Sequence, residues 1–243
     1  MLILSGLLLL SLNACKEDSD PEPLQTGKIT GELRLTDELG VEFSNHINMN
    51  VTAEGQSVGI STASGNYEIT NLPTGTYNLT YSKSGFGTYK RFNIQVIAGA
   101  DETVLNGIDY LGQKSTTQIT NLSVNFNTVD STYGIGCDIF PTPVAGSPRA
   151  FRLFFGKSGT VGPTDYQYTP SNTWLASTGS GQITGYPRSE FYSNGFSAGE
   201  TVFLIAYGES IRTNSYIDPV NSKKVFPNLN LGAPSNIVSF VLE

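Results

Sequence analysis

The residues of this chain that could bind a ligand are concentrated in one long segment, residues 156–189, which is rich in Gly, Ser and Thr. The candidate ligand-binding side chains are Asp165, Tyr166, Tyr168, Trp174 and Tyr186. Flat aromatic rings stack against the C–H face of a sugar, while nearby acids and amides bind its hydroxyl groups. The segment therefore predicts a ligand-binding loop. The alternative is that Trp174, the single tryptophan, pins the loop to its domain as a local core.

The sequence gives little support to catalysis. His46 is the sole histidine, and without a catalytic motif or metal-ligand spacing beside it we expect a surface or strand-edge residue. No nucleophile elbow, zinc-protease motif, P-loop or dinucleotide fingerprint occurs. Asp165, Glu190 and Glu200 are available acids, but their arrangement does not single out the two carboxylates of a glycosidase. We therefore predict a protein that is not an enzyme and uses no metal or cofactor.

Composition narrows the class of protein. The chain has 243 residues, of which 14% are charged and 26 are Gly, and it is rich in turn-forming and β-branched residues. This balance favours an all-β, extracytoplasmic protein. The formal net charge of -7 disfavours nucleic acid as a partner, because phosphate backbones require a basic face.

The N-terminal segment predicts where the protein is located. Residues 1–14 form an apolar run of signal-peptide length that ends in Leu12-Asn13-Ala14-Cys15. This ending resembles the lipobox of bacterial lipoproteins, which implies lipidation of Cys15 and membrane attachment through the acyl chains. The following Lys16-Glu17-Asp18 resembles the surface-export signal of Bacteroidetes lipoproteins, which implies an outer-membrane protein facing the cell exterior. The alternative for residues 15–26 is a plain hydrophilic spacer.

Residues 27–112 read as a series of short alternating strands. In each of three segments, alternate residues are predicted to share one face of a strand. The three sets are Ile29, Gly31, Leu33 and Leu35, then Ile47, Met49, Val51 and Ala53, and then Phe92, Ile94 and Val96. The stretch SGNYEITNLPTGTYNLTYSKSGF, residues 64–86, alternates in the same way around Pro73 and Gly75. It resembles the carboxypeptidase-regulatory-like family, which implies a small, non-catalytic, transthyretin-like β-sandwich.

A second domain is predicted for residues 118–243, after the polar linker GQKSTTQ. RAFRLFFGKS and TVFLIAYGES supply strands, the latter apolar enough to be covered on both sides. FSAGETVFLIAYG and PSNIVSFVL resemble the last two strands of fibronectin type III domains, which implies an immunoglobulin-like sandwich. Such a sandwich needs about 100 residues, and the excess lies in the long loop 156–189. Cys137 is expected to be a buried thiol without a disulfide partner.

The prediction is thus an all-β chain of two β-sandwiches in tandem after a lipoprotein signal peptide. The first hypothesis for its function is a lipid-anchored surface protein that binds or adheres to a polysaccharide or a surface protein and serves as an accessory for glycan capture. The second is a structural component of an outer-membrane assembly that makes contact through strand edges. The third is an unrecognised hydrolase.

Overall fold

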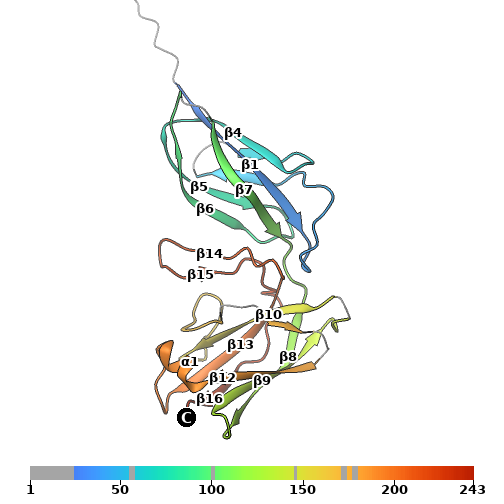
Figure 1. Cartoon of the computed structure of the whole chain (residues 1–243), viewed down its shortest axis with the longest axis vertical. Coiled ribbons are helices and arrows are strands. Elements are labelled where there is room, and N and C mark those ends of the chain that lie inside the picture. Colours follow the sequence, from blue (N-terminus) through green and yellow to red (C-terminus); the bar gives the residue numbers. More distant parts are fainter. Residues whose placement is uncertain (1–24, 55–57, 100–101, 145–146, 171–173, 177–179) are drawn as a thin grey trace, which may run out of the picture.

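The computed structural model describes residues 25–243, except for 55–57, 100–101, 145–146, 171–173 and 177–179. Two β-sandwiches are stacked end to end into an elongated molecule, with the first strand at one end and the C-terminus at the other (Figure 1). The predicted all-β sandwich architecture is confirmed. The predicted signal peptide, Cys15 and most of the acidic spacer lie outside the described residues. No helix in the described part of the chain is long and apolar enough to cross a membrane.

The first sandwich consists of a three-stranded and a four-stranded sheet. The three-stranded sheet has the order β4-β1-β7, and the other has the order β3-β2-β5-β6. The strands are β1 (Gly27–Thr36), β2 (Asn50–Ala53), β3 (Val58–Ile60), β4 (Asn66–Leu72), β5 (Gly75–Ser82), β6 (Tyr89–Val96) and β7 (Thr103–Gly112). Alternate residues fill the core between the sheets as predicted, among them Ile29, Leu33, Ile69, Leu79 and Tyr81.

The second sandwich pairs a sheet of order β12-β9-β8 with one of order β11-β10-β13-β16. Its elements are β8 (Gln118–Asn127), β9 (Thr132–Phe140), β10 (Arg149–Gly156), β11 (Trp174–Ala176), β12 (Ser180–Pro187), α1 (Arg188–Ser193), β13 (Thr201–Glu209), β14 (Tyr216–Ile217), β15 (Lys224–Val225) and β16 (Val238–Val241). The main core lies between the sheets. A smaller cluster, which we call the satellite core, covers the other face of β10 and β13 and consists of Phe154, Val161, Ile205, Phe226 and Leu229. The prediction that the β13 segment is covered on both sides is therefore confirmed.

Three expectations for the first sandwich need correction. A bulge at Asn93, whose φ is 61°, inserts one residue into β6 relative to β5, so Phe92 no longer shares a face with Ile94 and Val96. The Phe92 ring instead lies 5.9 Å from the ring of Tyr216 in the second sandwich. Ile47 is 40% exposed because β2 begins only at Asn50.

His46 is the third correction, because it is buried rather than exposed. Its side chain accepts a hydrogen bond at Nδ1 from the backbone N–H of Leu35, at 3.0 Å. The imidazole therefore satisfies a buried backbone donor and has a structural role. Cys137, by contrast, is buried as predicted, and burial raises the pKa of its thiol to about 11.

A polar junction holds the two sandwiches together. Glu38, in the loop after β1, accepts hydrogen bonds from Thr116 N at 2.6 Å and Thr116 Oγ1 at 2.7 Å, and from Arg149 Nη1 at 2.5 Å. Gly112 N donates to Asn214 Oδ1 at 2.7 Å, and the Arg212 guanidinium lies 3.7 Å above the Tyr110 ring. Arg212 and Asn214 belong to the segment between β13 and β14, and the β14–β15 hairpin that follows lies between the two sandwiches (Figure 1). The junction thus fixes their relative orientation.

Candidate functional site

The structure places two of the five predicted ligand-binding residues in the core. The Tyr168 ring stacks on Phe155 with 5.5 Å between centroids, and its hydroxyl group donates to Glu190. Tyr186 is 3% exposed and meets Phe155 edge-on. Burial and the contact with Glu190 raise the pKa of Tyr168. Neither ring offers a face to a ligand; both stabilise the second sandwich.

The remaining predicted residues divide between a satellite core and the surface. Tyr166 packs against Phe154 and donates its hydroxyl hydrogen to Lys224 O at 2.9 Å. Asp165 is exposed and accepts a hydrogen bond from Thr160 Oγ1 at 3.1 Å. These two residues share the lining of a shallow hollow of about 310 Å³. The five residues therefore do not form one aromatic surface.

The segment 156–189 also contains more regular structure than predicted, since it includes β11, all of β12 and the first residues of α1. Trp174 belongs to β11, and its backbone pairs with Phe151 of β10. The side chain of Trp174 lies outside the described residues. Part of the expected loop is therefore an edge extension of the two sheets rather than a free binding loop.

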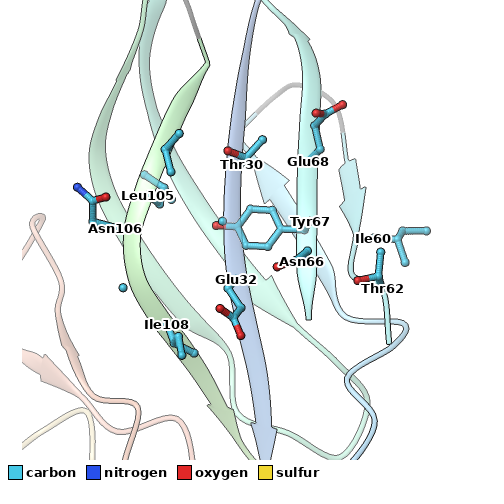
Figure 2. Close-up of a pocket in the computed structure, with 13 residues that line it drawn as sticks. Thr30, Glu32, Ile60, Thr62, Asn66, Tyr67, Glu68, Leu105, Asn106 and Ile108 are labelled. Carbon is cyan, nitrogen blue, oxygen red and sulfur yellow. The ribbon is translucent and has the colours of Figure 1, made fainter. Parts of the chain in front are cut away.

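A hollow with a volume of about 810 Å³ lies instead on the first sandwich, on the outer face of the β4-β1-β7 sheet. We call it the bulge groove (Figure 2). It is lined by Thr30, Gly31, Glu32, Ile60, Thr62, Asn66, Tyr67, Glu68 and residues 104–108. Strands from both sheets therefore contribute to one open groove.

An irregularity in β7 creates this groove. Thr30 pairs with Val104 and Glu32 pairs with Ile108, so three residues of β7 stand opposite the single residue Gly31. Gly107 makes the excursion possible with a φ of 86°, a conformation that side chains disfavour. Such bulges interrupt the ladder and redirect side chains, and they recur beside functional sites. Here the bulge turns Asn106 outward to solvent.

The groove has a fixed floor. Tyr67 lies across β1 beneath Gly31, where a Cβ atom would come 2.5 Å from the Tyr67 hydroxyl oxygen (Figure 2). The Tyr67 and Tyr81 hydroxyl groups form a buried hydrogen bond of 3.0 Å. Burial raises the pKa of Tyr67 to about 12, so both phenols remain neutral and hydrogen-bonded at physiological pH. Glycine at position 31 is therefore required by packing.

The lining combines polar and aliphatic side chains. Glu68 pairs with Lys28 at 3.1 Å, and Glu32 pairs with Arg34 at 2.6 Å, so cations hold both carboxylates in place. Hydroxyl and amide groups come from Thr30, Thr62, Asn66 and Asn106, and the exposed aliphatic side chains are Ile60, Val104 and Ile108. An amphipathic ligand with hydroxyl groups and C–H faces would find partners for both.

A metal site is not evident in the described part of the chain, where no cluster of three or more His, Cys, Asp or Glu side chains is placed to hold an ion. The aromatic residues of segment 156–189 gave no indication of the bulge groove, which lies in the other sandwich. The signal that could have found it is the Asn106-Gly107 pair within a strand, since glycine in a strand interior marks a bulge or a close approach.

Comparisons with known proteins agree with the expectation for the first sandwich. Residues 44–106 match the model of the carboxypeptidase regulatory-like domain, so this part of the chain is similar to that family. The matched segment contributes lining residues of the bulge groove from both sides of β1, including Ile60, Tyr67 and Asn106. The resemblance of the second sandwich to fibronectin type III domains stays a prediction. No curated protein matches the chain.

Several solved structures are similar to the chain, all at low identity. One is a candidate carbohydrate binding protein from Bacteroides uniformis, with 12% identity, 89% of this chain and 99% of that chain covered, and a TM-score of 0.34. A DUF3823 family protein from the same organism shares 12% identity over 91% and 100% of the two chains, with a TM-score of 0.31. A cohesin–X-dockerin complex from Acetivibrio cellulolyticus gives 14% identity, coverage of 36% and 58%, and a TM-score of 0.30.

Proposed function

We propose that this protein is a non-catalytic binding protein of the bacterial cell surface, anchored through lipidated Cys15, that captures polysaccharide in the bulge groove. The observation that carries the proposal is the lining of that groove, where hydroxyl, amide and carboxylate groups alternate with exposed aliphatic side chains. Sugars present hydroxyl groups at their edges and C–H groups on their faces, so this lining is complementary to them.

The arrangement of the molecule supports a presenting role. The junction around Glu38 and Asn214 makes the two sandwiches one stiff unit, and β1 begins at one end of it (Figure 1). A tether at Cys15 would hold that end near the membrane and point the second sandwich away from it. Residues 15–26 would serve as the spacer between the lipid and β1.

The bulge groove lacks the arrangement that glycoside hydrolysis requires. Hydrolysis needs one carboxylic acid that donates a proton and a second carboxylate that acts as base or nucleophile. Glu32 and Glu68 each form an ion pair and lie on an open sheet face, so both are engaged in charge pairing. We therefore propose binding without turnover. Release of reducing ends from a polysaccharide incubated with the protein would contradict this.

The test is glycan-array binding followed by titration calorimetry with the best polysaccharide. A Thr30→Ala/Asn106→Ala variant should bind at least about tenfold more weakly, since each lost hydrogen bond is worth about 1 kcal/mol. The matched control is Thr76→Ala/Gln95→Ala, two cross-strand partners exposed on the opposite sheet. Equal affinity of the groove variant and the parent would contradict the proposal.

One observation favours a structural role as a second candidate. β16 is an edge strand, paired only with β13, and Ile237 and Val241 beside and within it are 45% and 56% exposed. An exposed apolar edge can accept a strand from a partner protein. If this is the function, Val241→Lys should abolish co-purification with a membrane complex, while the Thr30→Ala/Asn106→Ala variant should not affect it.

A further inference from the structure

The second sandwich carries a groove of its own on the outer face of the β12-β9-β8 sheet. Two hollows of about 540 and 570 Å³ meet at Asn125 and follow β9 along its length. We call them together the glycine groove. The polar side chains that line it include Asn121, Ser123, Asn125, Asn127, Asp130 and Asp138. Six residue steps separate Thr132 from Asp138, which corresponds to roughly 20 Å of strand.

In the described part of the sheet, two glycines of β9 line this groove. Gly134 and Gly136 occupy consecutive outward positions of β9, the central strand of the sheet, opposite Asn125 and Ser123. Glycine weakens a strand interior, and its presence there marks a position where a ligand or another chain approaches the backbone closely. Gly136 is partly exposed whereas Gly134 is buried, so the open part of the floor lies at Gly136.

The walls are polar and held in place. A one-residue bulge in β8 between Thr120 and Ser123 gives Asn121 a φ of 52°, and its Nδ2 donates to Asp138 Oδ2 at 2.6 Å. Asn236 fixes the bulge by bonding both the N–H and the carbonyl group of Leu122, each at 3.0 Å. The groove is therefore formed before any ligand binds, which lowers the entropic cost of binding.

The lining chemistry selects a class of ligand. Among the described residues that line the two hollows there is no Lys or Arg, so phosphate, sulfate and uronate groups would lack a counter-charge. Apolar side chains are also few among the described lining residues, with Val124 in the first hollow and Phe126 in the second. Amides and hydroxyl groups both donate and accept hydrogen bonds, as do the hydroxyl groups of sugars.

We infer that the glycine groove is a second, independent binding site, which takes an extended neutral oligosaccharide laid along β9. This inference rests on the proposed function for its setting, but on residues of the other sandwich for its site. Two sites on one stiff molecule would allow a polymeric glycan to bind both at once, and the second site would act at a high effective concentration.

The experiment uses the full chain in detergent and an array of neutral and acidic oligosaccharides. We expect binding to neutral chains, with affinity reduced at least tenfold by Asn125→Ala and by Gly136→Ala, whose new Cβ fills the floor. Because that Cβ lies 2.8 Å from Ser123 Oγ, the Ser123→Ala/Gly136→Ala variant removes the clash and keeps the floor filled. It too should bind at least tenfold more weakly, with the melting temperature of the parent.

The outcomes separate this inference from the proposed function. The second site is supported if the glycine-groove variants lose affinity for neutral oligosaccharides while Thr30→Ala/Asn106→Ala keeps it. This holds even if the bulge groove binds nothing. Parent-like affinity in all glycine-groove variants, equal affinity for acidic chains, or no binding to any neutral oligosaccharide would each overturn it.

Discussion

The two sandwiches open their outer sheets to solvent in different ways. In the first sandwich, a three-residue bulge separates β7 from β1 around Gly31. The ring of Tyr67 packs against Gly31 and forms the floor of the groove. In the second, the ladder continues past Gly136, and a Cβ there would meet only Ser123 Oγ at the surface. Gly31 in the first groove is required because the Tyr67 ring packs against it. Gly136 in the second groove has no such neighbour apart from the Ser123 hydroxyl group.

Their polar interiors differ as well. The second sandwich buries an ion pair between Arg152 and Glu209, 2.7 Å apart and 2% and 0% exposed, under the satellite core. The first has Arg91 and Asp109 at its margin, 28% and 13% exposed. Removing one partner of a solvent-exposed ion pair costs little stability, because water solvates the remaining charge. Removing one partner of a buried pair costs much more, because the remaining charge stays without solvent. The comparison predicts which sandwich depends on its charges.

The largest effect should come from breaking the buried pair. Arg152→Ala leaves Glu209 charged in the interior and should lower the free energy of unfolding by about 3–5 kcal/mol. Arg91→Ala should cost about 1 kcal/mol or less. Denaturant titration measures both. The comparison fails if the two losses are equal, and Arg152→Met/Glu209→Leu should recover most of the loss because it removes both charges.

The next effect concerns the junction between the sandwiches. A Cβ at Gly87 would lie 1.8 Å from Asn228 Oδ1 and 2.8 Å from the Pro227 carbonyl group, so Gly87→Ala must push the two domains apart. We expect a loss of about 2 kcal/mol and the separation of one unfolding transition into two in calorimetry. Gly159→Ala, whose Cβ would meet nothing closer than 3.8 Å, is the control. A single transition in Gly87→Ala would show that the sandwiches do not depend on this contact.

The two groove glycines give a direct contrast of intermediate size. Gly31→Ala forces the Tyr67 ring away and strains the hydrogen bond between the Tyr67 and Tyr81 hydroxyl groups. The free energy of unfolding should fall by about 2 kcal/mol. Gly136→Ala displaces only a surface hydroxyl group and should cost less than about 1 kcal/mol. Thermal unfolding of both variants compares them. Equal losses would remove the distinction between a packed floor and an open one.

The smallest effect is that of pH on the junction. Burial raises the pKa of Glu38, but hydrogen bonds from Thr116 and the charge of Arg149 outweigh it and hold the pKa below its usual value. A depressed pKa in the folded state means that Glu38 contributes stability above its unfolded pKa of about 4, and that this contribution is lost as pH falls further. The junction should therefore weaken in acid, and Glu38→Gln should flatten this pH dependence in a thermal unfolding series.

Local patterns in the sequence predicted much of the fold. Tyr67 and Ile69, and Leu79 and Tyr81, are buried as their alternation indicated, because one face of each strand must leave water. The same reasoning was wrong for Phe92, since the bulge at Asn93 reversed its face. It also could not locate a binding surface: aromatic rings attract attention in a sequence, and Tyr168 and Tyr186 turned out to be core.

The sequence by itself determined the class of architecture, since period-two hydrophobicity and low charge permit little other than half-buried strands. Tertiary structure alone decided where the grooves lie. Each groove depends on pairing between strands distant in the chain, as when Gly31 meets residues 105–107, or Gly136 meets Ser123 across a bulged ladder. A bulge is a property of two strands in register, so a strand glycine such as Gly107 can mark where a bulge is tolerated but does not specify which partner strand it faces.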